Sequence, residues 1–120
     1  MNKEIKFEYG FNSVNGIIKK KYFLHEIPFM HEKCDVWNVL PLFYARQFTG
    51  LKDKNGKEIY EGDIDNKKRV CLYFPNLGSF GFKNPKYAPV TFLGQFIDRN
   101  QFVIGNIYEN PELLDNSVPF

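Results

Sequence analysis

The sequence has few cysteines, few alanines and no long apolar run. Only 2 of its 120 residues are Cys, whereas small secreted domains usually contain several disulfides. No apolar run approaches the roughly 20 residues that a helix needs to span a bilayer, and charged side chains interrupt residues 3–8, where a signal peptide would be apolar. We therefore expect a cytoplasmic protein with reduced thiols and no membrane partner.

The chain also lacks a strong charge of either sign. Sixteen Lys and Arg residues against fourteen Asp and Glu residues leave a formal charge of +2. This excess is too small to indicate nucleic acid or an anionic membrane as the partner. Charge alone therefore selects no functional class.

Aromatic residues are abundant, with 13 Phe, 7 Tyr and 1 Trp, whereas Ala occurs only at positions 45 and 88. This composition disfavours helices and suits strands, on which broad side chains pack well. At this length the default is one domain. We expect a single all-β domain over residues 1–120, either a small β-barrel or a strongly twisted antiparallel sheet with little helix.

Alternation and turn residues locate the expected elements. In the stretch IKFEYGF, Phe7 and Phe11 lie on one side and Glu8 on the other, which is typical of a half-buried strand. Asn15-Gly16 then predicts a hairpin turn. The remaining segments predict strands over 39–48, 69–74, 90–97 and 102–108. They also predict irregular structure over 28–35, a loop or a meandering sheet edge over 79–89 and a helical turn over 110–114.

The charged stretch TGLKDKNGKEIYEGD, residues 49–63, could be a ligand loop or a pair of turns. Five residues separate Gly50 from Gly56, whereas a phosphate-binding P-loop requires four and then Lys-Ser or Lys-Thr. The oxygen ligands of a calcium loop are not spaced correctly either. The stretch therefore predicts two tight reversals, with Ile59 and Tyr60 as core anchors.

Two segments resemble the signature sequences of a known family. They are FTGLKDKNGKEIYEGDI, residues 48–64, and VIGNIYENPELL, residues 103–114, together with the opening IKF, residues 5–7. These segments are similar to those of the YopX family of small phage and prophage proteins. The resemblance implies one all-β domain of phage origin. It carries over no catalytic residue, because that family has no established general activity.

The histidines and cysteines form a candidate zinc set. In HEKC, His31 and Cys34 have a usable chelating spacing, and two further residues would complete tetrahedral coordination. The candidate ligands are His25, His31, Cys34 and Cys71. The alternative is surface histidines with unligated thiols, and Cys71 in RVCLYF has the character of a small buried hydrophobe. No other cofactor is expected.

Catalysis has little support in the sequence. Cys34 with His31 is a nucleophile beside a base, but no oriented third group or oxyanion loop accompanies them. Carboxylates such as Glu61 and Asp63 fall in a turn, where they more often cap backbone amides than transfer protons. We therefore expect a protein that is not an enzyme.

Two basic clusters beside aromatics suggest a nucleic-acid or nucleotide binder. Phosphates would contact the lysines while bases stack on neighbouring rings. The alternative is that lysines protect strand edges and face solvent. The clusters consist of Lys19, Lys20, Lys21, Lys67, Lys68 and Arg69.

The segment over residues 22–44 is unusually rich in large apolar side chains, which either fill the core or form a docking surface. The candidate partner-binding residues are Tyr22, Phe23, Phe29, Met30 and Trp37. With the resemblance to a phage family, this segment suggests an accessory protein that binds a host bacterial protein. By analogy alone, the target is a defence effector such as a CRISPR nuclease, which the protein would inhibit as an anti-CRISPR. Self-association into a homo-oligomer is the alternative use of such a surface.

Overall fold

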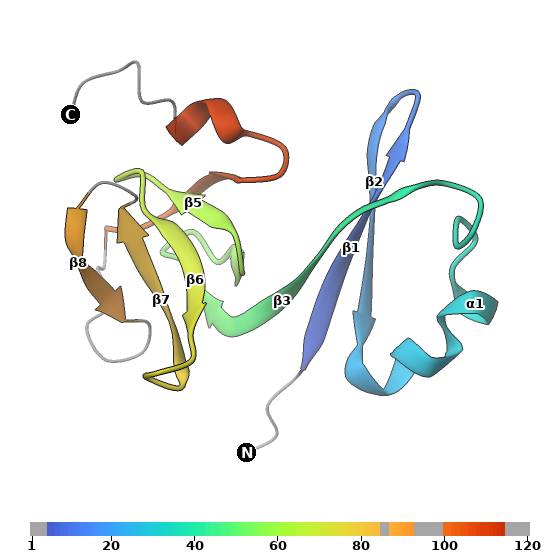
Figure 1. The fold of residues 1–120 in the computed structure, drawn as a ribbon, viewed down its shortest axis with the longest axis horizontal. Coiled ribbons are helices and arrows are strands. Elements are labelled where there is room, and N and C mark those ends of the chain that lie inside the picture. Colours follow the sequence, from blue (N-terminus) through green and yellow to red (C-terminus); the bar gives the residue numbers. More distant parts are fainter. Residues whose placement is uncertain (1–4, 85–86, 93–99, 115–120) are drawn as a thin grey trace. The chain divides into compact units, whose positions relative to one another are not determined.

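The structure is a computed structural model that describes residues 5–84, 87–92 and 100–114, the backbone alone for 87–92. The chain divides into two compact units, residues 1–50 and 51–120. Antiparallel strands form the framework of both units and are joined by turns and short helical segments (Figure 1). The predicted all-β class with little helix is confirmed, and its strands form open twisted sheets. Whether both units fold together as one domain stays a prediction.

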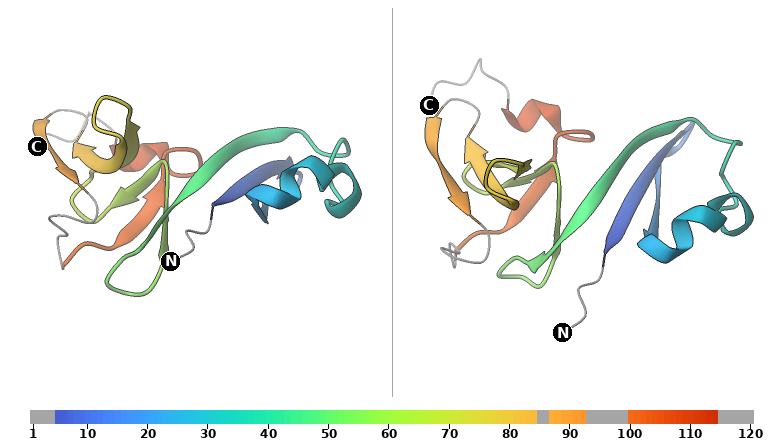
Figure 2. Two further views of the ribbon diagram at one scale, coloured as in Figure 1. Left: turned by 90° about the horizontal axis from the view of Figure 1, so that it is seen from below. Right: turned by 60° about the horizontal axis from the view of Figure 1, so that its bottom comes forward.

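Unit 1 is an antiparallel sheet in the order β2-β1-β3, followed in sequence after β2 by two short helical segments. The helical segments lie beside β2 in the view of Figure 1 and in the further views of Figure 2. The last two residues of β3 extend into unit 2. The elements are β1 (Lys6–Ser13), β2 (Gly16–Phe23), η1 (Leu24–Phe29), α1 (Met30–Lys33) and β3 (Leu42–Lys52). The predicted irregular stretch over 28–35 thus contains one short α-helical turn.

The core of unit 1 lies between the sheet and the helical segments. Phe11 and Tyr22 project from the sheet and Met30 and Cys34 from the segment after it, all at most 8% exposed. Trp37 packs edge-on against Phe11, with ring centroids 6.3 Å apart. Part of the segment over residues 22–44 therefore serves the core, because one thin sheet needs large side chains to cover its inner face.

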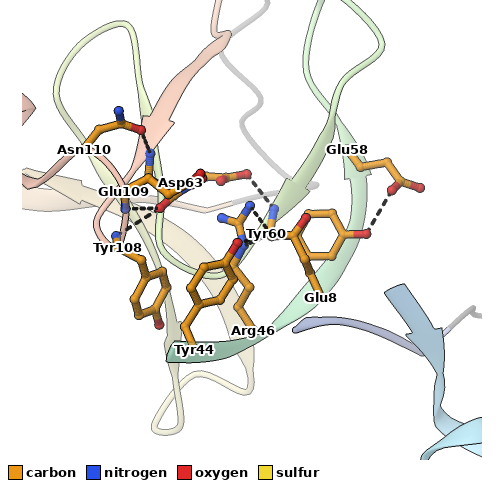
Figure 3. Close-up of polar contacts among 10 residues, drawn as sticks. Glu8, Tyr44, Arg46, Glu58, Tyr60, Asp63, Tyr108, Glu109 and Asn110 are labelled. Carbon is orange, nitrogen blue, oxygen red and sulfur yellow. Dashed lines mark hydrogen bonds and ion pairs between the residues drawn. The ribbon is translucent and has the colours of Figure 1, made fainter. Parts of the chain in front are cut away.

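Glu8 was expected on the solvent side of β1, but only 3% of it is exposed. Its Oε1 accepts hydrogen bonds from the Tyr44 hydroxyl at 2.7 Å and from Arg46 Nε at 3.0 Å (Figure 3). Arg46 Nη2 also lies 3.0 Å from the same oxygen. The expectation was wrong because β3 pairs with β1 and places both partners beside the carboxylate, which satisfies its charge.

Unit 2 contains an antiparallel sheet in the order β8-β7-β6-β5-β9. Its elements are β4 (Glu58–Tyr60), β5 (Asp63–Asp65), β6 (Val70–Phe74), β7 (Ser79–Asn84), β8 (Tyr87–Phe92), β9 (Val103–Asn106) and η2 (Pro111–Leu114). Ile59, Cys71 and Phe82 form its buried apolar cluster. Throughout the described parts of both units, no helix has the length and apolar character that crossing a membrane requires.

Of the two alternatives for residues 79–89, the loop is wrong, because β7 and the start of β8 occupy this segment, and β8 lies at the edge of the sheet. Tyr73 pairs with Phe80 and Cys71 with Phe82 across β6 and β7. Phe82 is fully buried, and the rings of Tyr73 and Phe80 meet edge-on at 5.2 Å. These cross-strand contacts outweigh the low strand propensity of the Gly and Asn residues. Part of the strand predicted over 90–97 lies outside the described residues.

Candidate functional site

The two signature segments are neighbours in unit 2. Strand β5 ends the first segment and β9 begins the second, and Asp63 pairs with Asn106 and Ile64 with Gly105. The amide of Ile107 donates to the carbonyl of Gly62 at 2.9 Å. Segments that are far apart in sequence therefore form one structural element of the fold.

Asp53 uses its carboxylate to hold the first reversal. Its Oδ1 accepts from the backbone amides of Asn55 and Lys57, both at 2.9 Å. Its Oδ2 accepts from the amide of Val103 at 2.8 Å, which attaches the turn to the start of β9. Both oxygens thus bond backbone amides, a structural use of the kind that Asp commonly has in turns.

Asp65 holds the reversal between β5 and β6 in a similar way. It is fully buried, and its Oδ1 accepts from the amides of Lys67 at 3.0 Å and Arg69 at 2.8 Å. Its Oδ2 accepts from Arg69 Nε at 2.7 Å and from Gln101 Nε2 at 2.8 Å. Arg69, a member of the second predicted basic cluster, therefore helps to hold this turn through its bonds to Asp65.

Asn106 organises the chain that follows β9. Its side-chain Oδ1 accepts hydrogen bonds from the backbone amides of Tyr108 at 3.0 Å and Glu109 at 2.8 Å. The backbone amide of Asn106 donates to Asn110 Oδ1 at 3.2 Å (Figure 3). Similarly, Asp63 Oδ2 accepts from the amide of Tyr60 at 2.7 Å. The predicted reversals are confirmed, and the polar side chains of the signature stabilise architecture.

The four candidate zinc ligands divide between the two units, with His25, His31 and Cys34 in unit 1 and Cys71 in unit 2. Cys34 is buried in the core of unit 1 and Cys71 in that of unit 2, and neither cysteine forms a disulfide. Across residues 5–84, 87–92 and 100–114, no three His, Cys, Asp or Glu side chains form a group that could hold a metal ion. His25 instead stacks on Phe23, and His31 lies 3.6 Å from Glu32. The geometry thus gives the predicted zinc site no support.

Cys34 is placed for packing. It is 5% exposed, and its neighbour Tyr22 is also buried. Burial raises the pKa of the Tyr22 hydroxyl, and a hydrogen bond with Cys34 raises it further. His31 is exposed and its Nε2 lies 3.6 Å from Glu32 Oε1, and the pairing of Cys34 and His31 as nucleophile and base stays a prediction.

The first basic cluster divides between the two faces of β2. Lys20 shares its face with the buried Tyr22, and its Nζ lies 2.9 Å from Asp35 Oδ1. A hydrogen bond to Asp35 raises the pKa of Lys20. Lys19 and Lys21 point to the other face because successive side chains alternate along a strand. A run of three lysines in sequence is therefore not one patch in space.

The candidate partner-binding residues also divide. Tyr22 and Met30 are buried and Trp37 packs on the core, whereas Phe23 is 36% and Phe29 50% exposed. Several exposed apolar side chains of unit 1 were not predicted: Leu24, Val39, Leu42 and Phe43. Sequence reasoning missed them because apolar residues occur throughout this segment, so no alternation marks the exposed ones.

These features define a small protein of two β units, one held largely by an apolar core and one rich in polar turn caps. The profile of the family described as YopX protein matches residues 3–115. The chain therefore belongs to the YopX family.

One solved structure with which the chain shares 28% identity is the crystal structure of protein EF1440 from Enterococcus faecalis. The match covers 90% of this chain and 75% of that one, with a TM-score of 0.46. No curated protein matches the chain.

Proposed function

We propose that the protein is a non-enzymatic phage-type accessory protein that binds a host bacterial protein in the cytoplasm. The observation that supports this function is the set of exposed apolar side chains around η1. Leu24 is 51% exposed and Phe29 50% exposed, although both belong to a unit that buries other large residues well. Large exposed apolar side chains of this kind are typical anchors at protein interfaces.

Membership of a family of small phage and prophage proteins supports a host protein as the partner. We further propose a defence effector, such as a CRISPR nuclease, as the class of target, which rests on analogy with other small phage proteins. The turn residues of unit 2 have a structural use, so we place the binding function in unit 1.

Affinity capture from host lysate tests this function. The wild-type chain should retain a specific partner that a Leu24→Ser/Phe29→Ser variant loses. Leu77→Ser is the matched control, because Leu77 is similarly exposed, at 57%, but belongs to unit 2. Equal capture by all three proteins, or loss of the partner in the Leu77 variant alone, would contradict the proposal. Inhibition of the captured effector in a purified assay then tests the anti-defence role.

A further inference from the structure

The hairpin of β6 and β7 extends beyond the strands on either side of it. Strand β5 pairs with β6 at Val70, and β8 pairs with β7 between Gly81 and Asn84. In the part of the chain that the structure describes, the strand residues of 73–80 therefore pair only with each other (Figure 1). We call residues 72–80 the hairpin arm.

The hairpin arm exposes apolar side chains on both of its faces. Leu72 and Tyr73 are adjacent on β6 and therefore point to opposite faces, yet they are 37% and 46% exposed. Leu77, in the turn between the strands, is 57% exposed. Residues 70–82 contain no charged residue, although charged residues make up 25% of the chain. A groove on a folded protein would contact one face of such a hairpin, whereas a lipid surface surrounds its end on all sides.

Two lysines lie at the base of the hairpin arm. Lys83 is exposed and pairs with Val70 across the two strands. Lys68 is half-buried, and its carbonyl accepts a hydrogen bond from Asn84 Nδ2 at 3.5 Å, which joins the chain before β6 to the end of β7. Neither lysine forms an ion pair with any residue that the structure describes.

The charge of this part of the chain has one sign. Residues 66–97 contain five Lys and Arg residues but neither Asp nor Glu, although the whole chain has a net charge of only +2. Asp65, which precedes this segment, is fully buried, and its carboxylate bonds Arg69 and Gln101. The base of the hairpin arm therefore combines positive charge with an uncharged apolar end.

We propose that the hairpin arm binds the surface of an anionic phospholipid membrane. Leu77 and Tyr73 would enter the interface, while Lys68 and Lys83 contact the lipid phosphates. The expectation of no membrane partner rested on the net charge and on the length of apolar runs, and neither quantity measures a local surface of this kind.

The length of the hairpin arm fits this arrangement. The strand rises about 13 Å from Ser79 to Lys83. Apolar groups of peripheral proteins enter the membrane interface by about 5–10 Å. With Leu77 at that depth, the Lys83 side chain would lie near the level of the phosphate groups.

Flotation of the full chain with vesicles tests this inference. Vesicles of phosphatidylcholine with about 30% phosphatidylglycerol should bind the chain better than phosphatidylcholine alone, and added salt should weaken the difference. Leu77→Ser should weaken binding about three- to tenfold, because it removes the apolar end of the hairpin arm. Lys68→Ala/Lys83→Ala should weaken binding to the anionic vesicles about five- to twentyfold and leave binding to the neutral ones unchanged.

Lys57→Ala is the matched control for charge. Lys57 is exposed and lies in the reversal that Asp53 attaches to the start of β9, at the opposite end of the sheet order from β7 and β8. The variant should bind anionic vesicles nearly as well as the wild type. A loss per lysine equal to that of the Lys68/Lys83 variant would overturn the proposal, because binding would then follow net charge alone.

A fluorescent label in the turn reports insertion directly. Leu77→Cys labelled with nitrobenzoxadiazole places the probe at the end of the hairpin arm, and Cys34 and Cys71 are buried and should not react. Anionic vesicles should shift the emission to the blue, and spin-labelled lipids should quench it. Unchanged emission from protein that floats with the vesicles would overturn the proposal.

Three other results also overturn the proposal. They are absence of flotation with anionic vesicles at low salt, wild-type flotation of Leu77→Ser, and a probe that responds to host proteins but not to vesicles. The last result would show that the hairpin arm docks on a protein.

This inference goes beyond the proposed host-protein binding, and the two can fail separately. Capture of the host protein depends on Leu24 and Phe29, whereas vesicle binding depends on Lys68, Leu77 and Lys83. Far-ultraviolet circular dichroism of each variant shows whether it is folded.

Discussion

The two units differ in how they hold their chain reversals. In unit 1, the segment between β2 and β3 is anchored by buried apolar side chains, among them Met30 and Cys34. In unit 2, the side-chain oxygens of polar residues hold the turns, as those of Asp53, Asp65 and Asn106 do by accepting hydrogen bonds from backbone amides. A buried apolar side chain can often be replaced by another of similar volume. A side chain that caps a turn needs an oxygen at a fixed position, which few residue types provide. This difference explains why the recognisable signatures lie mainly in unit 2.

The largest expected effect is that of Asp65→Ala. The variant removes four hydrogen bonds and leaves the half-buried Arg69 without its carboxylate, so the free energy of unfolding should fall by about 3–5 kcal/mol. Urea denaturation followed by circular dichroism measures this loss. Asp35→Ala in unit 1 is the control and should change stability far less, because the Asp35 side chain is 75% exposed.

The same denaturation tests the expectation of one domain. Trp37, the only tryptophan, lies in unit 1 and reports on it by fluorescence. If residues 1–120 unfold cooperatively, Asp65→Ala should lower the fluorescence midpoint as much as the circular dichroism midpoint. A Trp37 midpoint that stays at the wild-type value would instead show two independently folding domains.

Gly62→Val should destabilise the chain more than Gly56→Val. Both glycines have positive φ, +87° and +80°, which costs a β-branched residue about 1–3 kcal/mol. At Gly62, a Cβ would also lie 2.9 Å from the Tyr108 ring and 3.3 Å from Ile107, whereas nothing lies within 4 Å at Gly56. Crowding should add about 1–3 kcal/mol for Gly62→Val. Equal midpoints in urea for the two variants would show that β9 and the chain after it do not constrain this turn.

Unit 1 should lose stability in alkaline solution. The folded pKa values of Tyr22 and Lys20 are raised above 10.0 and 10.5. Their contribution is complete below those values and is lost as the pH rises through the folded pKa. The Trp37 midpoint in urea should therefore fall above about pH 10, and Tyr22→Phe should reduce this dependence. An alkaline decrease of the same size in Tyr22→Phe would exclude Tyr22 as a cause.

Unit 1 should also lose stability in acid, because the pKa values of two of its carboxyl groups are lowered in the folded state. The amide of Phe23 lowers the pKa of Glu26 below 4.5, and a hydrogen bond from Lys20 lowers that of Asp35 below 3.8. Their contributions exist above these ordinary values and are lost as the pH falls through the folded pKa. Asp35→Asn should flatten the acid limb of a midpoint-against-pH curve, and an unchanged limb would contradict this assignment.

The smallest expected effect is that of Lys54→Ala in the charged signature. Lys54 Nζ lies 5.0 Å from the centre of the Phe102 ring, a contact of less than about 1 kcal/mol at an exposed site. Stability and partner capture should both stay near wild type. Loss of capture in a well-folded Lys54 variant would give the signature a binding role as well as a structural one.

Much of the fold could be predicted, because local patterns determine it. The alternation in residues 5–11 predicted β1, and Asn55-Gly56 and Gly62 marked real reversals. The candidate sites were less predictable. Lys19, Lys20 and Lys21 were grouped because they are adjacent in sequence, although alternation along β2 puts Lys20 on the opposite face from the other two. Glu8 was expected in solvent, although Arg46, which is distant in sequence, donates a hydrogen bond to it.

The sequence by itself therefore determined the β class, the turns and the family, since these depend on steric preferences and patterns within a few residues. Only the tertiary structure decided which aromatics are exposed, which lysines share a face, and that the two signature segments pair as β5 and β9. The physical reason is strand pairing. Its register brings together residues that are far apart in sequence, and alternation then assigns each side chain to the core or to solvent.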